Sequence, residues 1–253
     1  MIRKLIQSTV GKFGYRLVRK EPVVQAPQPA PQPSYGLEPF LGLLKRYGFA
    51  PEHIIDVGAN RGTWTRRAVQ FFPTAQYTLI EPQDQLKTYI QDLFELGVKI
   101  DWINAGVSDV SGTLPLTIAY RDDSCTFLSL PEDSNAHKIL VPVKTLNEIV
   151  ASSDGPFPQM VKIDAEGLDL KVLAGASNLL GKTEIFFVEV VIWVNHPYQN
   201  TIPKVVPVME QAGYHVVDIT DINRSSKTGV LWLCELAFLR NGSSLFDSVT
   251  SYE

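Results

Sequence analysis

The sequence predicts an α/β fold: a doubly wound, mostly parallel sheet of seven strands with an antiparallel hairpin at its C-terminal end. Two observations favour this class. Short apolar stretches alternate with amphipathic stretches of about ten to fifteen residues, which is the pattern of strand–helix–strand crossovers. The last two apolar stretches, 215–220 and 230–240, are separated only by a loop, so we expect them to pair antiparallel.

Each element follows from a local signal. Short apolar runs bounded by turn residues predict strands, and apolar residues at helical spacing predict helices, which end at Pro73 or at glycines. Segments 112–120 and 138–146 have hairpin character. The expected strands lie at 53–58, 77–82, 98–108, 160–167, 183–194, 215–220 and 230–240, and the expected helices at 37–49, 63–72, 83–97, 168–181 and 201–214.

Composition divides the chain into a basic amphipathic segment at 1–20, a proline-rich linker at 21–34, a folded domain at 35–243 and a tail at 244–253. Six basic residues against Glu21 give the first 34 residues a charge of +5. The remainder therefore carries −9, because the whole chain carries −4. An acidic body without a basic face argues against nucleic acid as the partner.

The basic segment has two interpretations. It could bind the anionic inner face of a membrane as a peripheral contact, or it could pack on its own domain. No apolar run reaches the length of about 18 residues that a membrane span needs. Cys125 and Cys234 form no C-x-x-C pair and are expected to be reduced, so we expect a cytoplasmic protein.

The turn after the first strand, D-V-G-A-N-R-G at residues 56–62, lacks the glycine spacing of a dinucleotide site. A G-x-G-x-x-G fingerprint that starts at Gly58 needs glycines at positions 60 and 63, where Asn60 and Thr63 stand. The lysine of a phosphate-binding loop is also absent from this turn. These departures disfavour a nicotinamide-dependent oxidoreductase, which we keep as an alternative.

Acidic residues stand at the carboxyl ends of the expected strands, where open α/β sheets bind their ligands. Asp56 would repel a phosphate but attract an ammonium group or hold ordered water, and Glu81 can accept hydrogen bonds from both hydroxyls of a ribose. S-adenosylmethionine has a ribose, an amino-acid end and no phosphate, and it is the expected cofactor. The residues expected to bind it are Asp56, Gly58, Ala59, Asn60, Gly62, Glu81, Pro82, Asn104 and Ala105.

Five segments resemble, in order and spacing, the FkbM family of S-adenosylmethionine-dependent methyltransferases: IDVGANRG, LIEP, NAGVSDVSG, VKIDAEGLDLKVLAGA and FFVEV. The fourth is the most specific. The resemblance covers roughly residues 50–215 and implies a Rossmann-like, class I methyltransferase-like fold. It also implies O-methylation of a sugar, a glycan or another hydroxylated small molecule. A methyltransferase-like protein that binds without turnover is the remaining alternative.

A hydroxyl is a poor nucleophile near neutral pH, so a base within hydrogen-bond reach is expected. The candidates are Asp164, Glu166, Glu189 and His196. Asp164 could instead hold the amino group of the cofactor, Glu166 could cap the following helix, and His196 could be a surface residue. The acids could also hold a divalent cation, but the sequence has no spaced His/Cys motif and no metal site is predicted.

Three further features each have two interpretations. Trp64 and Tyr198 either line an acceptor pocket or pack in the core. The polar segment 121–130 either closes over the site as a lid or forms an ordinary surface loop.

Overall fold

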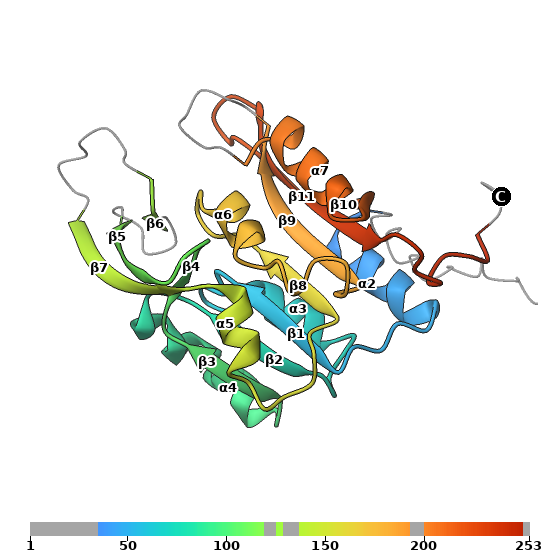
Figure 1. Ribbon diagram of the computed structural model, residues 1–253, viewed down its shortest axis with the longest axis horizontal. Helices are drawn as coiled ribbons and strands as arrows, with labels where there is room; N and C mark the ends of the chain where they lie inside the picture. Colours follow the sequence, from blue (N-terminus) through green and yellow to red (C-terminus); the bar gives the residue numbers. More distant parts are fainter. Residues whose placement is uncertain (1–34, 119–124, 129–136, 193–199, 250–253) are drawn as a thin grey trace, which may run out of the picture. The chain divides into compact units, whose positions relative to one another are not determined.

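The computed structural model describes residues 35–118, 125–128, 137–192 and 200–249. Its centre is a sheet of seven strands in the order β10-β11-β9-β8-β1-β2-β3 (Figure 1). Strand β11 is antiparallel to both of its neighbours, whereas β9, β8, β1, β2 and β3 pair in parallel. The predicted fold class is therefore confirmed. The strands are β1 His53–Val57, β2 Gln76–Ile80, β3 Lys99–Ile103, β8 Met160–Ile163, β9 Ile185–Val191, β10 Tyr214–Arg224 and β11 Leu231–Arg240.

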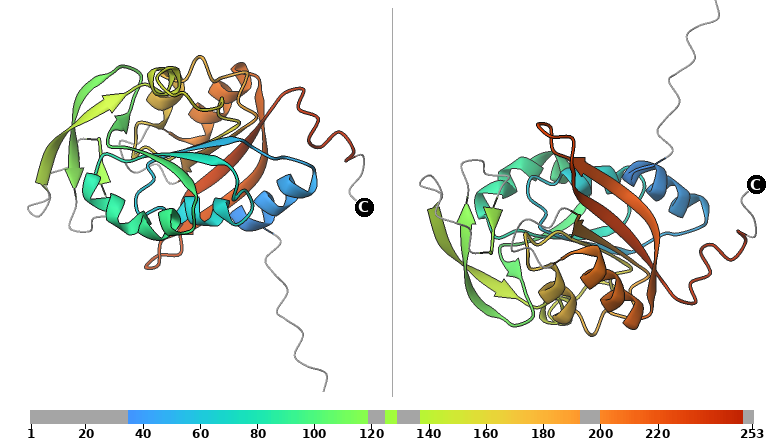
Figure 2. Two further views of the ribbon diagram at one scale, coloured as in Figure 1. Left: turned by 90° about the horizontal axis from the view of Figure 1, so that it is seen from below. Right: turned by 90° about the horizontal axis from the view of Figure 1, so that it is seen from above.

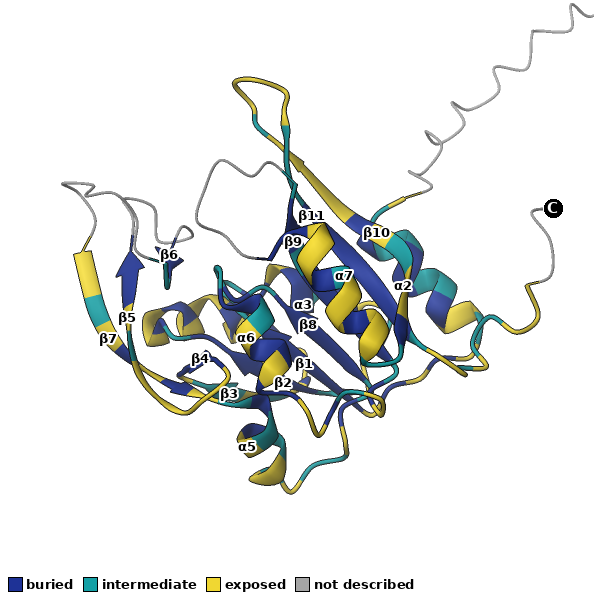
Figure 3. Ribbon diagram, turned by 45° about the horizontal axis from the view of Figure 1, so that its top comes forward, coloured by how far each residue is buried: buried dark blue, intermediate teal, exposed yellow. Residues whose placement is uncertain are grey.

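Helices cover both faces of the sheet, as a doubly wound fold requires (Figure 2). One face carries α5 Leu146–Ala151, α6 Asp169–Ala174 and α7 Ile202–Gln211. The other carries α2 Leu37–Arg46, α3 Thr63–Val69, and the 3₁₀ turn η1 Asp84–Ile90 that runs into α4 Gln91–Glu95. The central strands are buried, and several helices, α2 and α7 among them, turn apolar residues inward and exposed ones outward (Figure 3).

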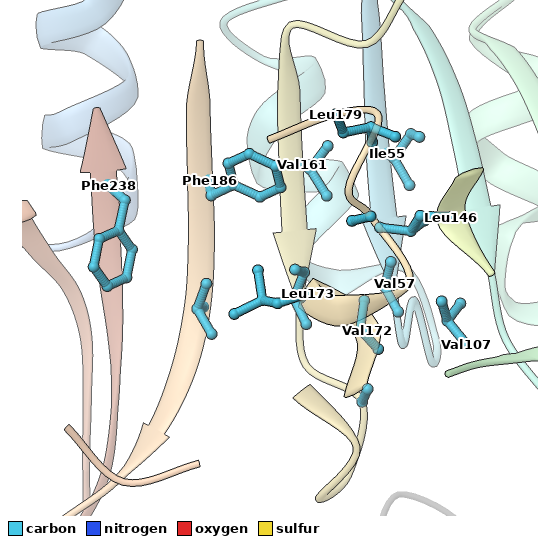
Figure 4. Packing of buried hydrophobic residues seen from close by; sticks show 14 of the residues in the cluster. Ile55, Val57, Val107, Leu146, Val161, Val172, Leu173, Leu179, Phe186 and Phe238 are labelled. Carbon is cyan, nitrogen blue, oxygen red and sulfur yellow. The ribbon is translucent and has the colours of Figure 1, made fainter. Parts of the chain in front are cut away.

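Alternate side chains of the central strands enter two separate hydrophobic clusters. Phe186 lies among Val161 and Leu173 on the α6 side (Figure 4). Its neighbour Phe187 points to the other face, where its ring packs edge-on against Phe40 at 5.9 Å and Trp64 at 5.4 Å between ring centroids. Burial on both faces explains why these strands are near-continuous apolar runs rather than alternating ones.

A second sheet of four strands lies beside the first, in the order β4-β7-β5-β6. The predicted hairpin character of 112–120 and 138–146 is confirmed, because β5 and β7 pair antiparallel. The single strand predicted at 98–108 is wrong. The chain turns at Asn104 and Ala105, so β3 and β4 belong to different sheets. The strands of this second sheet are β4 Gly106–Val107, β5 Gly112–Ile118, β6 Cys125–Thr126 and β7 His137–Lys144.

Two other local predictions need correction. The helix predicted at 83–97 begins as a 3₁₀ turn and becomes α-helical only at Gln91. The short helix α5 was not predicted, although its signal is present: Thr145 Oγ1 accepts a hydrogen bond from the backbone N–H of Glu148, which is the N-cap half of a capping box.

Leu245 and Phe246 pack against the α2 side of the core, and the Phe246 ring meets Tyr47 at 5.2 Å, so part of the predicted tail lies on the domain. Within the described ranges, no helix is long and apolar enough to cross a membrane.

The packing of Phe187 generates a stability prediction. Phe187→Ala removes a fully buried ring that contacts two other aromatic rings, so the free energy of unfolding should fall by about 3 to 5 kcal/mol in urea titrations. Leu140→Ala is the control, because Leu140 is 75% exposed, and its effect should stay within about 0.5 kcal/mol. Equal effects of the two substitutions would contradict this account of the core.

Candidate functional site

The site lies at the carboxyl edge of the large sheet, where β1 pairs with β2 on one side and β8 on the other. The chain leaves β2 and β8 toward opposite faces here, which opens a crevice at the edge of an α/β sheet. Two turns meet at this point: residues 56–62 after β1, and residues 164–167 after β8.

The β1 turn depends on residues in the left-handed backbone region: Gly58 at φ 72°, Asn60 at 47° and Gly62 at 74°. At Gly58 both the positive φ and the close packing require glycine. A Cβ there would lie 1.9 Å from the carbonyl oxygen of Asp164. The backbone N–H groups of Gly58 and Ala59 donate to the Ile80 carbonyl at 2.9 and 3.1 Å. Only glycine fits at position 58, so the turn lies directly against both neighbouring strands.

The side chain of Lys162 contacts both turns. Its Nζ lies 3.3 Å from Asp56 Oδ1 and 3.2 Å from Asp164 Oδ2, and it donates to the carbonyl oxygens of Val57 at 3.2 Å and Gly58 at 3.0 Å. Burial alone would lower the pKa of Lys162, but Asp164 and Asp56 more than offset this effect and the pKa is raised. The buried ammonium therefore stays charged and holds both turns.

Asp56 serves this network instead of facing a cavity. It is fully buried, and its Oδ2 accepts a hydrogen bond of 2.6 Å from Thr65 Oγ1 while Oδ1 faces Lys162. The sequence interpretation made Asp56 a direct partner of a ligand ammonium. Its position beneath the turn favours a positioning role, because its charge is already compensated by Lys162.

Glu81, just after β2, holds the β1 turn from its other side. Its Oε2 accepts from the backbone N–H of Asn60 at 2.9 Å and its Oε1 from that of Gln83 at 3.0 Å. Burial raises the pKa of Glu81, although these N–H groups and Lys162 oppose the shift. The side chain of Gln83 also hydrogen-bonds to this carboxylate, which has about four acceptor positions in all, so Glu81 can still accept a ligand hydroxyl group.

The β8 turn is supported by Asp169 at the start of α6. Asp169 Oδ1 accepts from the Ala165 backbone N–H at 2.9 Å, and burial raises the pKa of Asp169 to about 6. Glu166 has a left-handed backbone, φ 52°, and a pKa raised by burial and by Asp164. The N-cap of α6 is Leu168 and no side chain caps it, so the helix-cap interpretation of Glu166 is not supported.

The segment 125–128 lies across the β8 turn as a strap. Thr126 Oγ1 and the Phe127 N–H both donate to the Glu166 carbonyl, at 3.0 and 3.4 Å, and the Phe127 ring lies over Gly106. Of the predicted lid 121–130, this is the described part, and it lies over the site. Beneath it is a cavity of about 20 Å³, lined among others by Glu81, Pro82, Ala105 and Glu166.

Asn104 holds the loop that follows β2. Its Nδ2 donates to the carbonyl oxygens of Glu81 at 3.2 Å and Pro82 at 3.0 Å. Its side chain therefore fixes the β2 loop, while the backbone of the next residue, Ala105, faces the small cavity.

A larger cavity of about 550 Å³ opens on the α3 side of the β1 turn. It is lined by Gly58, Ala59 and Asn60 of the turn, by Trp64 of α3, and by charged residues of the strands. A cavity of about 660 Å³ at the opposite, amino edge of β1 and β2 is remote from both turns. The charged residues that the strands place on the wall of the 550 Å³ cavity are Lys162, Glu189, Asp221 and Glu235, together with Asp164 just after β8.

Four carboxylates stand at one level across neighbouring strands, and the outermost, Asp221 of β10, is the direct partner of Glu235. Ile163 pairs with Val188, so the next residues, Asp164 and Glu189, lie side by side, and Glu189 is the direct partner of Glu235 in the β9–β11 pair. Burial, reinforced by Asp164, raises the pKa of Glu189. The pKa of Glu235 is raised by burial to about 7, and its Oε1 accepts a hydrogen bond of 2.5 Å from Thr220.

Sequence analysis missed Lys162 and Glu235. Each is a charged residue in the interior of a strand and has apolar or small neighbours on both sides, which is the signal that singled out Glu189. Trp64 packs on Phe187, as the core interpretation expects, and it also lines the 550 Å³ cavity. His196 and Tyr198 lie outside the described residues. No cluster of His, Cys, Asp and Glu suited to a metal ion occurs in the described ranges.

A family model described as the methyltransferase FkbM domain matches residues 56–216. No curated protein matches the chain.

Solved structures with a similar fold include three bacterial methyltransferases. The precorrin-6y C5,15-methyltransferase of Geobacter metallireducens has 13% identity, with 79% of this chain and 86% of that chain covered and a TM-score of 0.46. The magnesium protoporphyrin IX methyltransferase of Synechocystis, solved with bound S-adenosylmethionine, has 10% identity, 81% and 79% coverage and a TM-score of 0.46. The N-methyltransferase NodS of Bradyrhizobium japonicum has 9% identity, 81% and 94% coverage and a TM-score of 0.49.

The family match spans more than half of the 253 residues and includes both turns of the site. It decides against the nicotinamide-dependent oxidoreductase and against the binding protein without turnover. The chain belongs to the FkbM methyltransferase family and is an S-adenosylmethionine-dependent methyltransferase.

Proposed function

We propose that this methyltransferase acts on a hydroxyl oxygen of a sugar, a glycan or another polyhydroxylated small molecule. The observation that supports the proposal is the row of Asp164, Glu189 and Glu235 on the wall of the 550 Å³ cavity, beside the β1 turn. Carboxylates are acceptors for hydroxyl groups, and a carboxylate with a raised pKa is suited to take a proton near neutral pH.

The residues at the carboxyl edge fit S-adenosylmethionine. Glu81 retains acceptor capacity for a ribose hydroxyl, and the backbone of Gly58, which carries no Cβ, lines the cavity. Asp164 is one-third exposed and reaches both cavities, so its carboxylate can meet the amino group of the cofactor. Pro82 and Ala105 would border the adenine. When bound, S-adenosylmethionine supplies an electrophilic methyl group on a sulfonium.

The chain's own residues must align the acceptor and receive one proton. Asp164 is held by Lys162, 3.2 Å away, whereas no ion pair of Glu189 is present among the described residues. A Glu189 carboxylate oxygen is therefore the proposed acceptor of the hydroxyl proton. Its raised pKa makes it a stronger base than an exposed glutamate.

The cofactor assignment predicts the binding of S-adenosylhomocysteine, the stable product. Glu81→Ala removes the ribose acceptor, and Gly58→Ala places a methyl group against the Asp164 carbonyl. Each should weaken binding at least tenfold, about 1.4 kcal/mol, in isothermal titration calorimetry. Gly97→Ala is the matched control, because Gly97 has nearly the same φ, 73°, but nothing within 4 Å of its added Cβ. Wild-type affinity in Gly58→Ala would refute this placement of the cofactor.

The base assignment predicts a loss of turnover without a loss of cofactor binding. Glu189→Gln should lower kcat for methyl transfer by about 100-fold or more, because the amide cannot accept the hydroxyl proton. The Kd of S-adenosylhomocysteine should remain unchanged. The rate is measured as the transfer of labelled methyl groups to a panel of glycosides and matched amino sugars. Glu210→Gln, exposed on α7, is the control. Labelling of the amino sugars alone would contradict the hydroxyl acceptor.

We also propose that residues 1–20 bring the enzyme to an anionic membrane surface. Six basic residues stand between positions 1 and 20 with no acidic one, and the apolar residues recur at helical spacing. The full chain should float with vesicles that contain anionic lipid and remain behind with zwitterionic ones. A variant with glutamine at the six basic positions should lose this binding. Equal flotation of the two chains would rule the contact out.

A further inference from the structure

Two buried polar groups on the wall of the 550 Å³ cavity are used neither by the cofactor turn nor by the proposed base. They are the carboxyl group of Glu235 on β11 and the indole N–H of Trp64 on α3. The two side chains are neighbours that come from different layers, since α3 packs on the sheet face and β11 belongs to the sheet.

Trp64 presents a donor without a partner. The residue is only 9% exposed, and its Nε1 makes no hydrogen bond within the described part of the chain. The Phe187 ring packs edge-on against the indole at 5.4 Å, so packing fixes the orientation of the ring. A buried N–H that lacks an acceptor costs stability, and such a group in a cavity wall is a place for a ligand oxygen.

Glu235 presents the complementary acceptor. It is 8% exposed, and Thr220 donates to its Oε1 at 2.5 Å. Burial raises the pKa of Glu235, and the Thr220 hydroxyl and the nearby indole N–H of Trp64 both oppose that shift, so the indole faces this carboxyl group without forming a hydrogen bond of normal geometry. Because Thr220 occupies Oε1, the second oxygen remains for a donor from the cavity. No salt bridge to Glu235 is formed by the described residues, and the nearby Lys162 is already shared by Asp56 and Asp164.

A hydroxyl group satisfies both at once, because its oxygen accepts and its hydrogen donates. We propose that Trp64 Nε1 and Glu235 form a second acceptor subsite, which binds a hydroxyl adjacent to the one that is methylated. The inference rests on the proposed function for its reacting hydroxyl, which Glu189 serves. Glu189 and Glu235 are direct cross-strand partners, and Cβ atoms of such pairs lie about 4.5 to 5.5 Å apart. Two neighbouring hydroxyls of one sugar ring suit this spacing.

The subsite narrows the acceptor to a vicinal diol or polyol. An alcohol with one hydroxyl would leave the Trp64 N–H and the second Glu235 oxygen unpaired. A site built to hydrogen-bond a substrate hydroxyl discriminates strongly against an analogue that lacks it, since its buried polar groups lose their partners. Glu235 and Trp64 are therefore specificity-determining residues for the acceptor and not for the cofactor.

The first test is binding, which needs no turnover. In ¹H–¹⁵N spectra of the full chain saturated with S-adenosylhomocysteine, Trp64→Phe identifies the Trp64 indole signal among those of the four tryptophans. Titration with a series of methyl pyranosides should shift this signal to saturation, and cyclohexanol should not shift it. Glu235→Gln should weaken the pyranoside effect at least tenfold, whereas Glu210→Gln should leave it unchanged. An unmoved Trp64 signal, or equal shifts with cyclohexanol, would overturn the subsite.

The second test separates the subsite from the cofactor site and from the base. With an acceptor that is turned over, Glu235→Gln and Trp64→Phe should each raise KM about tenfold and leave the Kd of S-adenosylhomocysteine at its wild-type value. For the wild type, a deoxy acceptor that lacks the second hydroxyl should show the same tenfold rise in KM. For the two variants, removal of that hydroxyl should raise KM no further. A weakened Kd would assign both residues to the cofactor and refute the proposal. If no hydroxyl is methylated while the indole signal responds, the proposed function fails and the subsite stands.

Discussion

The buried ammonium of Lys162 is the interaction on which the geometry of the carboxyl edge depends. It compensates two carboxylates, Asp56 and Asp164, and it holds the carbonyl oxygens of Val57 and Gly58. Without it, the fully buried carboxylate of Asp56 would lose its counter-ion, and breaking a buried pair of this kind costs about 3 to 5 kcal/mol. One lysine thus allows an acidic crevice to exist at the switch point of the sheet.

The two halves of the sheet supply different parts of the chemistry. The parallel strands β1, β2 and β8 end in the turns that would hold the cofactor, with Gly58 and Glu81 fixed by backbone contacts. The antiparallel strand β11 then adds a side chain, Glu235, that no crossover unit of the sheet provides. The acceptor side of the crevice therefore depends on the C-terminal hairpin, and the cofactor side does not.

Much of this arrangement could be predicted from the sequence, because local patterns carried it. Alternating strands and helices indicated the doubly wound sheet, and the glycine spacing of residues 56–62 argued against a dinucleotide. Other features depended on register. Nothing local in L-W-L-C-E-L says that Glu235 faces Glu189, since that follows from the pairing of β9 with β11. The break of one predicted strand into β3 and β4 arose likewise from pairing of Gly106 with Val143 in another sheet.

Roles were harder to predict than positions. Asp56 stands at the end of β1 as expected, but its partner lies about a hundred residues away on β8, so its compensated charge was invisible in the sequence. The same holds for Asn104, whose side chain turns back to the β2 loop. By contrast, Glu81 lies where a ribose acceptor was expected, because the rule that places it depends only on the end of a parallel strand.

The most direct test of this account is the affinity of Lys162→Met for S-adenosylhomocysteine, measured by calorimetry beside Lys162→Met/Asp56→Asn. The double variant removes the unpaired buried charge along with the lysine, so its folding can be verified by near-ultraviolet circular dichroism. The account predicts that the folded double variant binds at least tenfold more weakly than the wild type, because the two turns have lost their common anchor. Wild-type affinity in that folded variant would contradict the central role of Lys162.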